Sequence, residues 1–122
     1  MASRVKTPWL EQDLAYFGVT PLASRAFVPA TFDADEAWGW AYVLEGATLG
    51  GRTLYPAAAA RWRLGPDTGA RYLHGYGDAT GRMWNAFTRA LQAAPLQGAR
   101  ADAVVAAANA AFGSLDALFR AG

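Results

Sequence analysis

The feature of the sequence best suited to holding a ligand is a row of very small residues in one predicted helix. Gly39, Gly46, Gly50 and Ala57 follow one another at intervals of seven, four and seven residues, which places them on one face of an α-helix. A helix face without side chains lets another surface come close to the backbone. That surface is either a second helix packed through small residues or a planar ligand lying against the main chain. Composition alone leaves both interpretations open.

His74 is the only histidine, and the chain contains no cysteine. Disulfides, iron–sulfur clusters, cysteine-ligated zinc and thiol nucleophiles are therefore excluded. A lone histidine in a loop is more often hydrogen-bonded locally than bound to a metal, although its imidazole could serve as an iron ligand. The sequence has no interpretable hydrolase triad, phosphate-binding loop or dinucleotide fingerprint.

Four helices are predicted to position these residues. The first begins with Thr7 as its N-cap and ends at Gly18, which is the type of residue that most often terminates a helix. The second spans about 34–64 and contains the row of small residues. Either Asp33 or Asp35 caps it, since acidic groups suit the positive end of the helix dipole.

A loop over residues 19–33 joins these two helices. After the second helix, a turn at residues 75–77 precedes a third helix that opens at Asp78 or Thr80. A break at 95–98 separates it from an alanine-rich last helix with a period near 3.6 residues. No segment alternates as a strand does. The fold class is therefore predicted to be all-α, with residues 1–122 forming a single domain.

The overall composition is that of a folded protein without a strong electrostatic preference. Hydrophobic residues make up 53 % of the chain and charged residues 17 %, which excludes a disordered chain. A formal net charge of +1 gives no field that would favour nucleic acid or an anionic membrane. No secretory signal and no transmembrane helix are predicted. Together with the lack of cysteine, this favours a cytoplasmic location.

The run Tyr42-Val-Leu-Glu-Gly-Ala-Thr-Leu-Gly-Gly51 closely resembles the distal-helix motif of bacterial haem oxygenases, in particular the biliverdin-producing type associated with bacteriophytochromes. Leu73-His-Gly-Tyr-Gly77 and the following Thr80-Gly-Arg-Met-Trp84 resemble that family's next segment. The similarity covers nearly the whole chain, including the first and last predicted helices. It implies a haem-oxygenase-like helical bundle.

In that family haem is both substrate and cofactor, and it lies between a proximal helix, whose histidine binds the iron, and the glycine-rich distal helix. The resemblance implies oxidative cleavage of haem to biliverdin, carbon monoxide and ferrous iron, with electrons from a ferredoxin or a reductase. By position, the resemblance implies that Gly46, Gly50 and Gly51 are the catalytic residues, because they let the haem come close to the helix. The residues implied to bind haem are Ala47, Tyr76, Arg82 and Arg89; an arginine suits a haem propionate.

The sequence departs from this family at its N-terminal side. The family's proximal histidine lies near the start of its first helix, which has no counterpart in this chain, so the bundle is predicted to be N-terminally truncated. His74 is then the only imidazole available as a metal ligand. A bundle without this helix would expose the apolar faces that the helix covers. Such exposure favours self-association as a homo-oligomer. Two alternatives stay open beside haem cleavage: non-catalytic binding of haem or another tetrapyrrole, and a ligand-free, self-associating helical protein.

Overall fold

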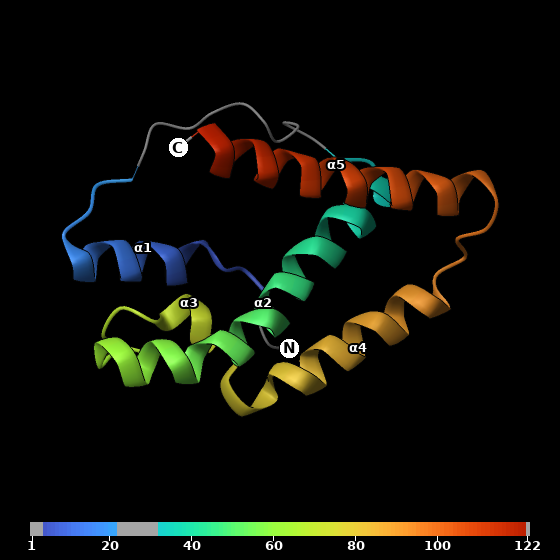
Figure 1. The fold of residues 1–122 in the computed structure, drawn as a ribbon. Helices are drawn as coiled ribbons and strands as arrows, with labels where there is room; N and C mark the ends of the chain where they lie inside the picture. The colour runs from blue at the N-terminus through green and yellow to red at the C-terminus, as the bar shows by residue number, and fades with distance from the viewer. Residues whose placement is uncertain (1–3, 22–31, 122) are drawn as a thin grey trace. The chain divides into compact units, whose positions relative to one another are not determined.

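The computed structural model describes residues 4–21 and 32–121, apart from the side chains of Leu118, Phe119 and Ala121. Most of the predicted loop over residues 19–33 lies outside the described residues. The elements are α1 (Thr7–Phe17), α2 (Ala34–Trp62), α3 (Arg71–His74), the 3₁₀ helix η1 (Gly77–Ala79), α4 (Thr80–Ala93) and α5 (Ala99–Ala121). The described residues contain no strand, so the predicted all-α fold class is confirmed (Figure 1).

The chain divides into two compact units, which are described separately below. The first unit consists of Met1–Ala23 and Ala47–Met83, and the second unit consists of Ser24–Gly46 and Trp84–Gly122. The division passes through α2 and through α4, so each unit takes part of both helices. That residues 1–122 form a single domain stays a prediction.

α1 begins one residue earlier than its sequence pattern predicts. Its N-cap is Lys6, which makes no side-chain capping bond, and Thr7 is the first helical residue. The prediction of Thr7 as N-cap is therefore wrong by one position. Pro8 is tolerated in this first turn because its missing N–H would have had no helical partner. The helix ends at Gly18 as predicted, with φ +67°, a left-handed conformation that glycine adopts readily.

α2 opens with a reciprocal cap between Asp33 and Glu36. The Asp33 Oδ1 accepts the Glu36 N–H at 2.8 Å, and the Asp33 N–H donates to Glu36 Oε1 at 3.3 Å. This arrangement is a capping box with aspartate as the N-cap. Of the two predicted caps, Asp33 fills the role, whereas Asp35 forms an ion pair with Arg100 of α5 at 3.1 Å.

In the second unit, α2 packs closely against α5 at Gly39 (Figure 1). A Cβ built on Gly39 would lie 2.5 Å from the Val104 carbonyl oxygen and 2.6 Å from the Ala107 Cβ. Beside this contact lies a core of buried residues: Trp40, Val43, Ala107 and Ala111. Gly39 therefore serves close packing between helices, which is one of the two interpretations of the row of small residues.

In the first unit, Asp13 of α1 holds the start of α3. Its Oδ1 accepts the Arg71 N–H at 2.8 Å, and its Oδ2 accepts the Tyr72 N–H at 2.9 Å. Main-chain N–H groups in the first turn of a helix have no partner within that helix. α3 has only four residues, which is too short for a helix to persist alone. The carboxylate therefore fixes α3 alongside α1 (Figure 1).

Several large apolar side chains are exposed in both units. In the first unit they are Leu10, Tyr16, Phe17, Leu54 and Trp62, and in the second unit Tyr42, Leu44, Val105 and Phe112. Exposed apolar area of this kind is compatible with self-association, which stays a prediction. Within the part of the chain that the structure describes, no helix is long and apolar enough to cross a membrane.

Replacing Gly39 by alanine should lower the free energy of unfolding by about 1–3 kcal/mol, because the added methyl group would clash with the main chain of α5. The matched control is Gly113→Ala in α5, where a Cβ would meet no described heavy atom within 4 Å. That change should raise the free energy of unfolding by about 0.5–1 kcal/mol. Denaturant unfolding measures both. Equal stabilities for the two variants would contradict the close contact at Gly39.

Candidate functional site

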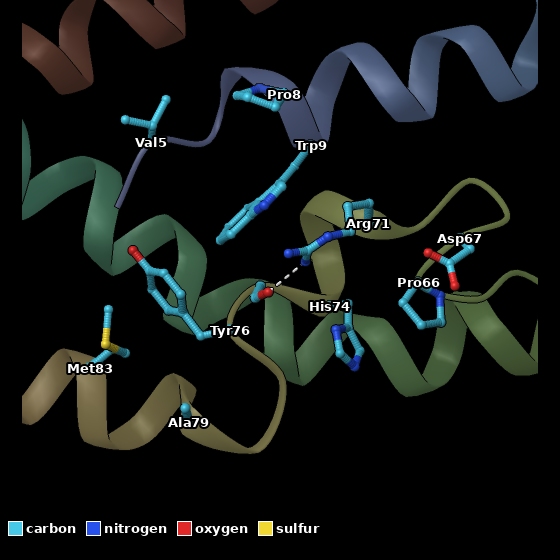
Figure 2. A pocket seen from close by; sticks show the side chains of 11 residues that line it. Val5, Pro8, Trp9, Pro66, Asp67, Arg71, His74, Tyr76, Ala79 and Met83 are labelled. Atoms are coloured by element: carbon cyan, nitrogen blue, oxygen red, sulfur yellow. Dashed lines mark hydrogen bonds between the residues drawn. The ribbon is translucent and has the colours of Figure 1, made fainter. Parts of the chain in front are cut away.

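A cavity of about 610 Å³ lies within the first unit, and this volume is typical of sites for small molecules. Its walls come from the segment before α1, from α1, from the loop before α3, from α3 and from the start of α4. Trp9, Arg71, His74 and Tyr76 lie around it, with Met83 at the α4 side (Figure 2). Aromatic, cationic and imidazole groups therefore border one space.

An aromatic pair and a lysine border one side of the cavity. The Trp9 and Tyr76 rings meet edge to face, with centroids 5.3 Å apart and planes at 78°. The Lys6 Nζ donates to the Tyr76 hydroxyl at 2.9 Å and lies 5.1 Å from the centre of the Tyr76 ring. Arg4 Nη2 donates to the Met83 carbonyl oxygen at 3.1 Å. The segment before α1 is thus bound to the residues that follow α3.

Two contacts hold the guanidinium group of Arg71. Its Cζ lies 4.3 Å from the centre of the Trp9 ring, and its Nη1 donates to the Gly75 carbonyl oxygen at 2.7 Å (Figure 2). Gly75 has φ +60°, and a Cβ there would lie 3.1 Å from the Thr48 Cγ2. The turn that presents this carbonyl oxygen therefore favours glycine for both backbone and packing reasons.

His74 lies at the end of α3, partly buried, with its ring edge-on to Tyr55 at 5.1 Å. Burial lowers the pKa of His74 below its ordinary value of 6.5, and the positive charges of Arg52 and Arg71 lower it further. Two nearby carboxylates oppose these effects only in part. The imidazole is therefore neutral at neutral pH, with one ring nitrogen able to accept a hydrogen bond or bind a metal.

The three glycines predicted as catalytic lie in different surroundings. Gly51 is buried, and a Cβ there would lie 3.2 Å from the Leu73 carbonyl oxygen, so it allows close packing of α2 on α3. Gly50 is exposed, and no described heavy atom lies within 4 Å of its Cβ position. Gly46, in the second unit, has the Trp84 ring at 3.8 Å, an ordinary contact distance. Gly50 alone among them leaves the backbone fully open.

The structure brings together only two of the other predicted site residues. His74 and Tyr76 both line the cavity, but none of the three glycines is among the described residues that form it. Ala47, Arg82 and Arg89 are exposed. Arg82 belongs to the first unit and Arg89 to the second. Among the described residues, no cluster of three or more histidine or acidic side chains could hold a metal ion.

Sequence reasoning missed Trp9, Arg71 and Asp13 as parts of the site. Trp9 recurs with other apolar residues at helical spacing, which indicates a packed helix face rather than a cavity wall. Asp13 and Arg71 are 58 positions apart, so no local pattern links the carboxylate to the helix that it caps. The available signal was weak: an acidic residue on an otherwise apolar helix face.

The stability of the protein should fall as the pH is lowered through the range where His74 gains its proton. The folded-state pKa of His74 is below the unfolded value of 6.5, so between these values the unfolded chain binds more protons than the folded chain. The free energy of unfolding therefore decreases as the pH drops below about 6.5. Denaturant unfolding at several pH values should show a steeper decrease for the wild type than for His74→Gln. Identical pH profiles would contradict this prediction.

Comparison with known proteins places the chain in a family. The model of the haem oxygenase family matches residues 3–121, which includes residues of both units. Searches of curated proteins and of solved structures gave no significant match. The resemblance seen in the glycine-rich helix is confirmed at the level of the family, while the bacteriophytochrome-associated type stays a prediction. Because the match extends over nearly its whole length, the chain belongs to the haem oxygenase family.

Proposed function

We propose that the chain binds haem as a substrate against α2 at Gly50 and cleaves it oxidatively to biliverdin, carbon monoxide and ferrous iron. Membership of the haem oxygenase family supports haem as the ligand. The structural observation that carries the proposal is the open backbone at Gly50, where an added Cβ would meet no described heavy atom within 4 Å. A flat ring can come closer to the main chain there than at any residue with a large side chain.

The surface around Gly50 suits the apolar face of a porphyrin. Ala47, Gly50, Leu54 and Ala57 lie on one side of α2, and all four are exposed. Leu54 is 60 % exposed, so a bound ring would remove apolar area from water on both partners. Burial of apolar area is favourable by about 25 cal/mol per Å². The four residues carry no charge, so no ionised group would be desolvated beneath the ring.

The proposed reaction needs molecular oxygen and electrons from a donor such as a ferredoxin or a reductase. Because Gly50 has no side chain, it leaves space for oxygen between the helix and the ring. Ala47 has no polar side chain to anchor a water molecule, so ordered water bound elsewhere would have to supply protons. Arg82, exposed in the same unit, is a candidate partner for a haem propionate. Arg89 has that role only through the family resemblance.

Binding of haem or another tetrapyrrole without cleavage is the second candidate function. The position of His74, the only histidine in the chain, favours it. His74 lines the cavity of the first unit, and Gly50 is not among the described residues that line that cavity. The imidazole that could bind the iron and the glycine that could face the ring are therefore parts of different surfaces.

Replacing Gly50 by leucine should weaken hemin binding at least about tenfold, because the new side chain would stand where the ring approaches the backbone. Absorbance titration of the Soret band measures the dissociation constant. The control is Gly113→Leu, the same change at an exposed glycine of α5 that also has no described neighbour within 4 Å. Its hemin affinity should equal that of the wild type. Equal affinities for both variants would remove Gly50 from the binding surface.

Adding ascorbate or a ferredoxin system to the hemin complex should replace the Soret band with the spectrum of biliverdin. This conversion is the readout for cleavage. A stable Soret band that persists under these conditions would support the second candidate function instead. A titration with no saturable band would contradict both functions.

The same experiment with His74→Ala tests the only imidazole. We expect an unchanged Soret band, because Gly50 is not among the residues described around His74. A shifted band would make His74 the iron ligand and move the haem site into the cavity.

A further inference from the structure

The proposed haem surface on α2 does not include the cavity of the first unit. Its volume of about 610 Å³ lies within the range for sites that bind a small organic molecule. Its described lining includes the apolar side chains of Val5, Pro8 and Met83. Figure 2 shows Val5 and Pro8 on one side of the cavity and Met83 on the other, with Trp9, Arg71 and Tyr76 between them.

Two aromatic rings in the cavity wall lie next to positive charge. Trp9 and Tyr76 meet edge to face at 5.3 Å. The Lys6 Nζ lies 5.1 Å from the centre of the Tyr76 ring and 5.9 Å from the centre of the Trp9 ring, and the Arg71 Cζ lies 4.3 Å from the centre of the Trp9 ring. A cation is attracted to the negative face of an aromatic ring, so the two rings hold both cations at the wall of the cavity.

Arg71 supplies a positive charge in a defined orientation. The contact of Cζ with the Trp9 ring and the bond from Nη1 to Gly75 hold the guanidinium in place, and Asp13 holds the Arg71 main chain. Its Nη2 makes no hydrogen bond to the described residues and is available to a ligand oxygen. A carboxylate there would gain a charge-assisted bond, which is stronger than a neutral one.

The surroundings of the cavity are also positive beyond Arg71. The Lys6 ammonium group donates to the Tyr76 hydroxyl. Burial first, and then the charges of Arg52 and Arg71, lower the pKa of His74; Arg52 also forms an ion pair with Asp78 at 3.7 Å. The carboxylate of Asp13 is already bonded to two main-chain N–H groups. Asp67, which lines the cavity, is exposed to solvent, so water screens its charge. A single negative charge on the ligand is therefore favoured.

We propose that this cavity binds a small carboxylate with an apolar body, with the carboxylate on Arg71 and the apolar body against the apolar side chains that line the cavity. The site is independent of the proposed haem surface, since Gly50 is not among the residues described around the cavity. Each proposal can therefore fail without the other.

Isothermal titration with 2-naphthoate tests the proposal, with 2-naphthalenemethanol as the uncharged probe of similar shape. The wild type should bind 2-naphthoate with 1:1 stoichiometry and at least about tenfold more tightly than the alcohol, because only the carboxylate can use Arg71. Arg71→Gln should remove most of this difference. The matched control is Arg61→Gln, at an exposed arginine of α2 that is not among the described lining residues, and it should leave the affinity unchanged.

Circular dichroism establishes that each variant is folded. If Arg71→Gln does not fold, the comparison of the two probes on the wild type still decides the outcome, and so does the Trp9 indole N–H resonance, which should shift on addition of 2-naphthoate. Equal affinity for the charged and the uncharged probe would overturn the proposal. So would unchanged binding in folded Arg71→Gln, or the lack of saturable binding. Loss of hemin binding in Gly50→Leu with naphthoate binding intact would show that the two sites are separate.

Discussion

The candidate site depends on one carboxylate, that of Asp13, which accepts the two main-chain N–H groups at the start of α3. A helix of four residues cannot offset its own ordering cost, so its place is set by contacts with other elements, namely this one with α1 and the close packing of α2 at Gly51. Arg71 and His74 are the first and last residues of α3, and the turn at Gly75 follows directly. If α3 were not held, the guanidinium would lose its position on Trp9 and the cavity would lose one wall. An interaction between two distant segments thus underlies most of the chemistry that the first unit offers.

The row of small residues in α2 serves more than one purpose. Each glycine weakens a helix by about 1 kcal/mol relative to alanine, so the row is costly unless close approach compensates. At Gly39 that compensation is contact with α5, and at Gly51 it is contact with the main chain of Leu73. At Gly50 the structure shows no described neighbour that requires glycine. The two interpretations of the row, close packing of helices and access for a planar ligand, therefore apply to different residues of the same helix, and the second is supported by the family to which the chain belongs.

The separation between Gly50 and His74 bears directly on the chemistry. Haem cleavage in this family uses a histidine opposite the glycine-rich helix, and the single histidine of this chain lies instead in a cavity bordered by Arg71, Trp9 and Tyr76. Burial and neighbouring positive charge favour the neutral form of its imidazole. The same positive charge makes the cavity receptive to an anion. The first unit therefore combines an exposed, uncharged stretch of α2 at Gly50 with a cavity bordered by positive charge, and the two proposed ligands, haem and a small carboxylate, are matched to these two surfaces.

Local chemistry in the sequence was sufficient to predict the all-α class, the end of α1 at Gly18, an aspartate cap at Asp33 or Asp35 and the family, because caps, breaks and a ten-residue motif involve neighbouring positions only. The Thr7 cap was wrong by one residue, since the pattern of a threonine followed by a proline does not distinguish the N-cap from the first helical position.

Only the tertiary structure decided which glycine of α2 is covered and which is open, because this depends on which residues of other helices lie beside each glycine. It also decided that Asp13, 58 positions from Arg71, builds the cavity. Contacts over such separations leave no periodicity in a single sequence, and so the elements were predictable while the site that they form was not.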